Sequence, residues 1–211
     1  MKIIPTIFAH NKKEFTERFK KLLPVSKNLQ IDFMDGKFVK AKSLQPSQIP
    51  DLKKYSNNFE AHLMISNPQL QIKKLKKKGF KKIIFHHNST QNINSLIKKI
   101  KSLHMKVFLA INPNVAVNNV IPYLKQLDGI LFLGVQPGKE RQDFIHQIYE
   151  KIRFLRKKNK TIKIQVDGGA TPEVIKRLAK LKVNYINSGS YIADSKNPKE
   201  TYKRLNALVK K

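Results

Sequence analysis

Short apolar runs alternate with longer amphipathic or lysine-rich segments along the whole chain. Eight runs have the length and β-branched content of strands, and they span residues 2–8, 28–33, 59–65, 81–86, 106–111, 129–133, 162–167 and 184–188. Helices are predicted for residues 12–23, 46–55, 68–78, 90–103, 117–124, 144–159, 172–181 and 198–209. Asn67, Thr171 and Asn197 each precede a proline, so we expect them to cap the helices that follow.

This alternation predicts a class α/β protein, a single (β/α)8 TIM barrel that forms one domain over residues 1–211. Parallel strands need crossover helices, and eight of them close a sheet without leaving a free edge. The alternative is an open, doubly wound sheet. A glycine-rich dinucleotide loop after the first strand would favour that sheet, but residues 5–11 contain no glycine.

The net charge of +29 raises nucleic acid as a partner, but the distribution of the charge argues against a dedicated binding face. Lysines are spread over every predicted helix, and arginine is scarce. We therefore predict a solvated lysine coat, no specific nucleic-acid partner, and a field that attracts a phosphorylated metabolite. The chain starts directly with an apolar strand and lacks a long apolar run, which predicts a cytoplasmic protein without a membrane segment. We also expect a homo-oligomer.

Polar residues stand at the carboxyl ends of several predicted strands, where a barrel carries its active site. The chain has no cysteine, so histidine and carboxylate groups must perform any catalysis or metal binding. Alternation along the strands predicts one inward-facing set, made of Gln30, Asp32, Met34, Glu60, His62, Met64, Gln165 and Asp167.

Asp32, His62 and Asp167 end three different strands and are predicted to converge. They suit a divalent metal, and they equally suit acid/base work in which two carboxylates serve opposite faces of one carbon. A lone aspartate at such a position more often caps a loop. His86 or His87 is predicted to be a hydrogen-bonding residue at the barrel mouth.

Six motifs in the order IDFMDGKFV, AHLMISNP, AINPN, VQPG, VDGG and SGS resemble the ribulose-phosphate 3-epimerase family over essentially the whole chain. The resemblance implies a barrel that interconverts ribulose 5-phosphate and xylulose 5-phosphate by moving the C3 proton through an enediolate. It implies that Asp32 and Asp167 are the acid/base pair and bind one divalent metal ion, zinc, iron or manganese, together with His62. It also implies that Met34 and Met64 lie over the enediolate.

The resemblance further implies that backbone amides after the last three strands bind the substrate phosphate. The matching positions are Gly138, Gly168, Gly169, Gly189 and Ser190. Thr6 stands where the family has a serine that contacts the substrate, and it keeps a hydroxyl. After the sixth strand the family pattern PGFGG is replaced by PGKER. Lys139 or Arg141 is expected to compensate by binding the phosphate with its charge, and the alternative is a solvated loop.

Gln30 stands where the family has a histidine metal ligand, so its carbonyl oxygen is predicted as a weaker fourth ligand. The site would then work with three strong ligands plus Gln30 or water, prefer a harder ion such as manganese or magnesium, or be inactive. A hexulose-phosphate 3-epimerase and a catalytically impaired, basic binding protein are the alternative functions. Retention of Asp32, His62 and Asp167 together argues against the impaired protein, because buried charges are costly.

Overall fold

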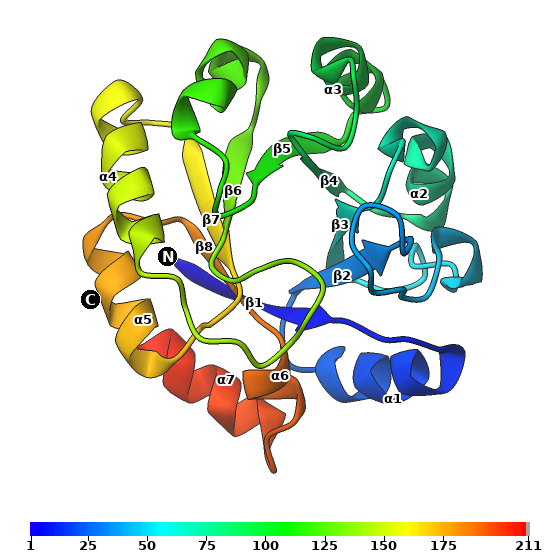
Figure 1. The fold of residues 1–211 in the computed structure, drawn as a ribbon. Coiled ribbons are helices and arrows are strands. Elements are labelled where there is room, and N and C mark those ends of the chain that lie inside the picture. The colour runs from blue at the N-terminus through cyan, green and yellow to red at the C-terminus, as the bar shows by residue number, and fades with distance from the viewer. Residues whose placement is uncertain (210–211) are drawn as a thin grey trace.

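The computed structural model describes residues 1–209, and its eight strands close into a parallel barrel (Figure 1). The strands are β1 (Lys2–Ile7), β2 (Asn28–Met34), β3 (Asn58–Met64), β4 (Lys82–His86), β5 (Lys106–Ile111), β6 (Gly129–Leu133), β7 (Lys163–Asp167) and β8 (Tyr185–Ser188). Each strand pairs with the next, and β8 pairs with β1 through Ile3 and Ile186. The predicted (β/α)8 barrel is confirmed and the open sheet is excluded. Residues 210–211 of the predicted domain lie outside the described part.

Helices surround the barrel, and most of them lie within the predicted ranges (Figure 1). The α-helices are α1 (Lys12–Leu22), α2 (Ile72–Lys78), α3 (Ile93–Ser102), α4 (Gln147–Lys158), α5 (Pro172–Lys180), α6 (Ser190–Ala193) and α7 (Pro198–Ala207). The 3₁₀ helices are η1 (Pro46–Gln48), η2 (Pro68–Leu70) and η3 (Val117–Gln126). Among residues 1–209, no helix combines the length and the apolar character needed to cross a bilayer.

Two predicted helices form as 3₁₀ helices, one of them much shorter than predicted, and proline explains both. The segment predicted as a helix over residues 46–55 has only the 3₁₀ turn η1, because Pro50 forces the preceding Ile49 into an extended conformation with ψ of 137°. The segment predicted over residues 117–124 is the 3₁₀ helix η3, which contains Pro122. A proline inside a helix lacks the amide hydrogen and clashes with the preceding turn.

Two of the three predicted helix caps are confirmed. Thr171 Oγ1 accepts a hydrogen bond from the Val174 amide, and Asn197 Oδ1 accepts one from the Glu200 amide. The prediction for Asn67 is wrong, because this residue adopts the left-handed conformation with φ of 56° and its side chain caps no backbone amide of η2. Asparagine tolerates this conformation better than most residues do.

The strands bury different groups on their two faces. Outward-facing residues such as Phe33, Leu63 and Phe85 pack against the helices in the main hydrophobic core, where each large side chain contributes about 1.5–3 kcal/mol. Inside the barrel, β4–β6 present an apolar cluster of Ile84, Phe108, Ala110, Leu131 and Leu133. The interior also holds a set of buried polar side chains, namely Thr6, Gln30, Glu60, His62, Gln165, Asp167 and Asn187.

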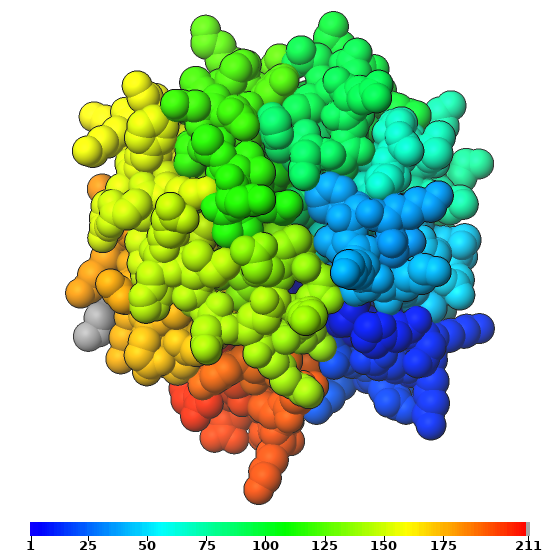
Figure 2. All heavy atoms as spheres, viewed as in Figure 1, coloured from blue at the N-terminus to red at the C-terminus, as the bar shows by residue number. Residues whose placement is uncertain are grey.

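The segment between β6 and α4 crosses the barrel end that faces the viewer in Figure 1. Figure 2 shows its yellow-green atoms covering the middle of this end. Two ion pairs hold the segment to the barrel rim. Arg18 on α1 donates to both carboxylate oxygens of Glu140 at 3.0 and 3.1 Å, and Arg141 donates to Asp194 at 2.7 Å.

Candidate active site

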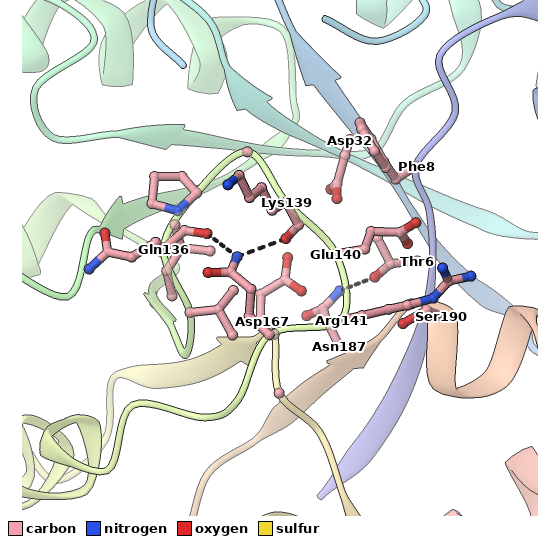
Figure 3. A pocket seen from close by; sticks show the side chains of 18 of the residues that line it. Thr6, Phe8, Asp32, Gln136, Lys139, Glu140, Arg141, Asp167, Asn187 and Ser190 are labelled. Carbon is pink, nitrogen blue, oxygen red and sulfur yellow. Dashed lines mark hydrogen bonds between the residues drawn. The ribbon is translucent and has the colours of Figure 1, made fainter. Parts of the chain in front are cut away.

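A cavity of about 100 Å³ opens at the carboxyl ends of the strands (Figure 3). Every residue predicted for the site lines this cavity except Gln30, which lies beneath it. Those lining residues are Thr6, Asp32, Met34, His62, Met64, Gly138, Lys139, Arg141, Asp167, Gly168, Gly169, Gly189 and Ser190. The barrel thus gathers side chains from both halves of the chain around one small volume.

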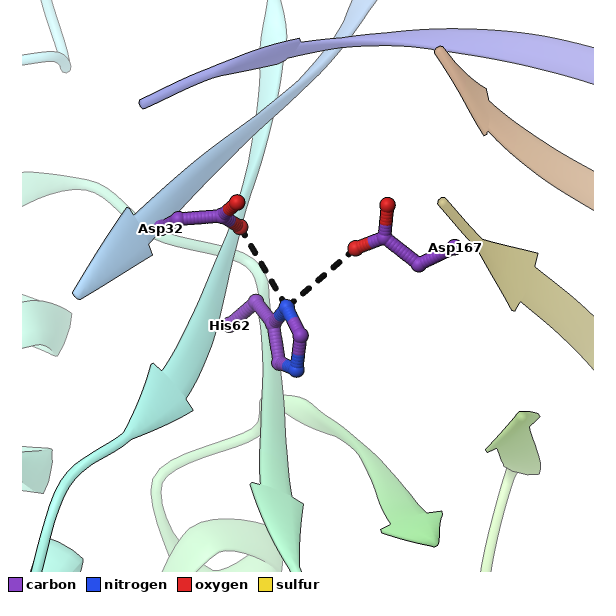
Figure 4. A group of neighbouring side chains, drawn as sticks. All are labelled: Asp32, His62 and Asp167. Carbon is purple, nitrogen blue, oxygen red and sulfur yellow. Dashed lines mark hydrogen bonds and ion pairs between the residues drawn. The ribbon is translucent and has the colours of Figure 1, made fainter. Parts of the chain in front are cut away.

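Asp32, His62 and Asp167 meet at the floor of the cavity, coming from the ends of β2, β3 and β7 (Figure 4). His62 Nδ1 lies 3.3 Å from Asp32 Oδ1 and 3.2 Å from Asp167 Oδ2. The His62 side chain is fully buried, and the two carboxylates are 11% and 12% exposed. The carboxylates approach the imidazole from two sides. An ion or substrate bound next to His62 Nδ1 would therefore contact both carboxylates.

The three side chains fit a divalent cation. One ligand atom from each lies within 4.8 Å of the others. Around a tetrahedral ion with bonds of about 2.1 Å, ligand atoms stand roughly 3.4 Å apart, close to the observed spacing from His62 Nδ1. Two carboxylates and one imidazole also form a donor set that zinc, iron and manganese accept. This geometry supports metal binding but does not distinguish the ion.

Burial and mutual charge shift the protonation of this cluster. Burial raises the pKa of Asp32 to about 6 and the charge of Asp167 adds to the rise, while the hydrogen bond from His62 opposes it. Burial lowers the pKa of His62, but the hydrogen bonds and charges of Asp167 and Asp32 outweigh it and raise the pKa to about 9. At neutral pH and without a metal, His62 is therefore an imidazolium ion between two carboxyl groups.

His86 fixes the ring of His62 from the other side. The two Nε2 atoms lie 2.9 Å apart, and the His86 side chain is fully buried at the end of β4. Burial and then the charge of His62 hold the pKa of His86 well below its ordinary value. A neutral His86 accepts the Nε2 proton of His62, which leaves His62 Nδ1 facing the carboxylates. His86 is thus a hydrogen-bonding residue inside the barrel and a partner of the cluster.

Gln30 lies one layer below Asp32 on β2 and is fully buried. Its Nε2 donates to Asp32 Oδ1 at 2.8 Å and to Asp167 Oδ2 at 2.6 Å. Gln165 Nε2 in turn donates to Gln30 Oε1 at 3.3 Å and to Asn187 Oδ1 at 2.6 Å. Sequence reasoning missed Asn187, although its alternation with Tyr185 on β8 contained the necessary signal.

An apolar wall closes one side of the cavity. Met34 and Met64 pack with Phe8, and all three are buried. Phe38 and Val39 of the following loop pack against this group. The wall places flexible thioether side chains next to Asp32, as expected for a cover over a reacting carbon.

Charged side chains, rather than a run of glycines, line the loop after β6. Glu140 contacts Arg18 from 122 positions earlier in the chain, and no local pattern in the sequence indicates this pair. Arg141 is bound to Asp194, and Lys139 is exposed. Figure 3 shows these loop side chains around the cavity that lies between Asp32 and Asp167.

Gly168 and Gly169 after β7 bring two loops together at the cavity. Both have positive φ values, 96° and 67°, which favour glycine. A Cβ atom on Gly168 would lie 2.5 Å from Val135, and one on Gly169 would lie 2.8 Å from the backbone of Phe144. The VDGG motif is therefore needed for the close packing of the loops after β6 and β7.

Residues 2–193 match the model of the ribulose-phosphate 3 epimerase family. A ribulose-phosphate 3-epimerase of Schizosaccharomyces pombe is 27% identical, over all of this chain and 94% of the relative. The cytoplasmic isoform of Oryza sativa is 31% identical over 86% of this chain and 82% of its own length. The enzyme of Buchnera aphidicola is 32% identical over 86% of this chain and 83% of its own length.

Solved structures support the same fold. A 3-hexulose-6-phosphate synthase from Salmonella typhimurium superposes with a TM-score of 0.74 at 14% identity, over 99% of this chain and 98% of that one. An orotidine 5'-phosphate decarboxylase from Pyrococcus horikoshii gives a TM-score of 0.71 at 15% identity, with 99% of both chains covered. At these identities the likeness concerns the barrel alone.

Proposed function

The chain belongs to the ribulose-phosphate 3-epimerase family, and from this premise we propose that it interconverts D-ribulose 5-phosphate and D-xylulose 5-phosphate. The enzyme is an isomerase that transfers a proton at C3. The observation that carries the proposal is the position of Asp32 and Asp167 on two sides of one cavity, with His62 between them. Epimerisation requires a proton to leave one face of a carbon and another to arrive at the opposite face.

Asp32 and Asp167 act as the two bases in this proposal. One carboxylate removes the C3 proton, and the other, as a carboxylic acid, delivers a proton to the opposite face of the enediolate. The pKa of Asp32 is raised to about 6, which brings its proton affinity closer to neutral pH than that of an ordinary aspartate. Met34, Met64 and Phe8 exclude water on one side of the reacting carbon.

Asp32, His62 and Asp167 are proposed to hold one divalent ion, zinc, iron or manganese. When bound, such an ion supplies positive charge that stabilises the negative charge developing on the substrate oxygens. His86 keeps Nδ1 of His62 directed at the ion site. Gln30 lies close enough to be the fourth ligand predicted from the sequence, but its carbonyl oxygen would have to replace its amide group at the carboxylates.

Metal binding is expected to release about one proton at pH 7.5. The pKa of His62 is raised to about 9, so a proton occupies Nδ1 at this pH and must leave when the ion binds. Affinity should rise about tenfold per pH unit between pH 7 and 8 and level off above pH 9. Below pH 6, protonation of Asp32 weakens binding further. Titration calorimetry with Mn²⁺ in buffers of different ionisation enthalpy measures the released proton; a pH-independent affinity from pH 6.5 to 8.5 would refute this linkage.

The phosphate end of the substrate is proposed to bind beside the loops after β6, β7 and β8. Support comes from the cavity lining, which includes Gly138, Gly168, Gly169, Gly189 and Ser190 together with Thr6. Lys139 and Arg141 add positive charge there. Glu140 also lines the cavity, but Arg18 pairs with both of its carboxylate oxygens. Asp194 pairs with Arg141 in the same way, so the positive charge that this loop offers a phosphate dianion comes from Lys139, unless Arg141 leaves Asp194.

Arg141→Ala is expected to raise KM for ribulose 5-phosphate about tenfold while leaving kcat within twofold, because a phosphate contact acts on substrate and transition state alike. Arg141 would exchange its bond to Asp194 for one to the phosphate. The matched control is Arg153→Ala on α4, where the arginine is also paired with a carboxylate, that of Glu150. Steady-state kinetics of both variants decide the matter. If the KM of Arg141→Ala equals that of the wild type, Arg141 belongs to a solvated loop and does not bind the phosphate.

Three further expectations belong to the same proposal. The reaction takes place in the cytoplasm, the compartment for which the rice relative, a cytoplasmic isoform, is named. The chain forms one domain over residues 1–211. It assembles as a homo-oligomer, which light scattering on the purified protein measures directly.

A further inference from the structure

A chain of buried polar side chains crosses the barrel interior beneath Asp32 and Asp167. It begins at Lys82 near the start of β4, whose ammonium group forms an ion pair with Glu60 on β3. Lys82 Nζ also donates to Gln165 Oε1 at 2.9 Å. The Lys82 and Glu60 side chains are only 11% and 6% exposed. Alternation along β4 places Lys82 on the same face as His86, so the lysine points into the barrel.

These charged partners allow only one orientation of the Gln165 amide. Lys82 has donors but no acceptor, so it must face the carbonyl oxygen of Gln165. Glu60 as a carboxylate has only acceptors, and its Oε1 lies 2.5 Å from Gln165 Nε2. Reversing the amide would oppose two donors at Lys82 and two acceptors at Glu60. The Gln165 nitrogen is therefore directed towards Gln30.

The two carboxylates and the Gln165 nitrogen together set the orientation of Gln30. Both amide protons of Gln30 face carboxylate oxygens, Asp32 Oδ1 and Asp167 Oδ2. Gln165 Nε2 has two protons and three acceptors, and Gln30 Oε1 at 3.3 Å is the most distant, after Glu60 Oε1 at 2.5 Å and Asn187 Oδ1 at 2.6 Å. Turning the Gln30 amide over would place its oxygen against two carboxylates and its nitrogen against the nitrogen of Gln165. A cation between the carboxylates would remove only the first of these conflicts.

We propose that Gln30 is a hydrogen-bond donor that bridges the two catalytic carboxylates and is not a metal ligand, and that Gln165, held by Lys82 and Glu60, is the residue that positions it. An amide nitrogen has no lone pair to offer a metal, so Asp32, His62 and Asp167 supply the protein ligands. The statement about metal ligation rests on the proposed function. The orientation of the amide does not, because it follows from hydrogen bonds among protein groups.

A double-mutant cycle with Mn²⁺ as the probe tests the proposal by titration calorimetry. Gln30→Leu is expected to bind Mn²⁺ within fivefold of the wild-type Kd, because no ligand is lost. Gln165→Leu is expected to bind at least fivefold more tightly, because Gln30 is then free to turn its oxygen to the ion. The double variant should lose this gain, and Gln147→Leu on the surface of α4 is the control. Mere structural damage would weaken binding, and would not tighten it.

Either of two results in the cycle overturns the proposal. In the first, Gln30→Leu binds Mn²⁺ more than fivefold more weakly than the wild type; in the second, Gln165→Leu shows no gain in Mn²⁺ affinity over the wild type. NMR of the metal-free wild type tests the orientation without any variant. The Gln30 side-chain amide protons, assigned through their own backbone resonances, should exchange with water at least 100-fold more slowly than those of Gln147. Equal exchange rates would refute the bridge. Failure of the wild type to bind Mn²⁺ would refute the proposed metal site, and amide exchange would still decide the inference.

Discussion

Asp32→Asn and Asp167→Asn are each expected to lower kcat for C3 epimerisation by at least about 10³-fold. Asparagine keeps the shape of the side chain but cannot accept a proton at neutral pH. Because inversion needs one base on each face, the loss of either carboxylate stops it. The remaining carboxylate should still exchange the C3 proton of one epimer with solvent. A coupled assay measures the inversion, and NMR measures the exchange.

Both aspartates are also proposed metal ligands, so the two roles must be separated. Activity is therefore measured at Mn²⁺ concentrations that saturate each variant, with bound metal determined by elemental analysis. Asp51→Asn is the control, because Asp51 is exposed and pairs with Lys53 on the surface. A metal-loaded Asp32→Asn or Asp167→Asn enzyme that keeps more than a tenth of the wild-type kcat would refute the two-base assignment.

His62→Ala is expected to weaken Mn²⁺ binding by about 100-fold or more, since even the loss of a residue that supports a ligand costs 10–100-fold. His62 is the only imidazole whose nitrogen lies between the two carboxylates in the part of the chain that the structure describes. Its loss also leaves Asp32 and Asp167 facing each other without the imidazolium ion. We expect the pKa of Asp32 to rise further as a result.

Titration calorimetry and metal analysis of the purified variant measure this effect. His146→Ala is the matched control, because His146 is exposed at the start of α4, away from the three ligands. Addition of excess Mn²⁺ should restore part of the activity of His62→Ala but none of the activity of Asp32→Asn. Binding by His62→Ala within fivefold of wild type would show that the ion site lies elsewhere.

The barrel could be predicted from the sequence because each strand contains its own signal. Alternation along β2, β3 and β7 was enough to place Asp32, His62 and Asp167 inside, and closure of the barrel then brought them together. Local chemistry also explains the failures. Pro50 and Pro122 prevent α-helices that the apolar spacing alone would favour.

Other features depend on contacts that no local pattern contains. The pair of Arg18 and Glu140 joins a helix near the start of the chain to a loop far along it, and both residues read as ordinary surface charges. The orientation of Gln30 likewise depends on Gln165 and Lys82, which lie on strands across the barrel. Sequence reasoning identified Gln30 as the unusual residue of the site, but only the hydrogen-bond network indicates which end of its amide faces the carboxylates.

The measurement that tests the two-base proposal most directly is NMR of ribulose 5-phosphate incubated with the Mn²⁺-loaded protein in deuterated water. If Asp32 and Asp167 serve opposite faces of C3, the xylulose 5-phosphate formed should carry deuterium at C3 from the first turnover onward. Xylulose 5-phosphate that keeps the original C3 proton, or no conversion at all, would contradict the proposal.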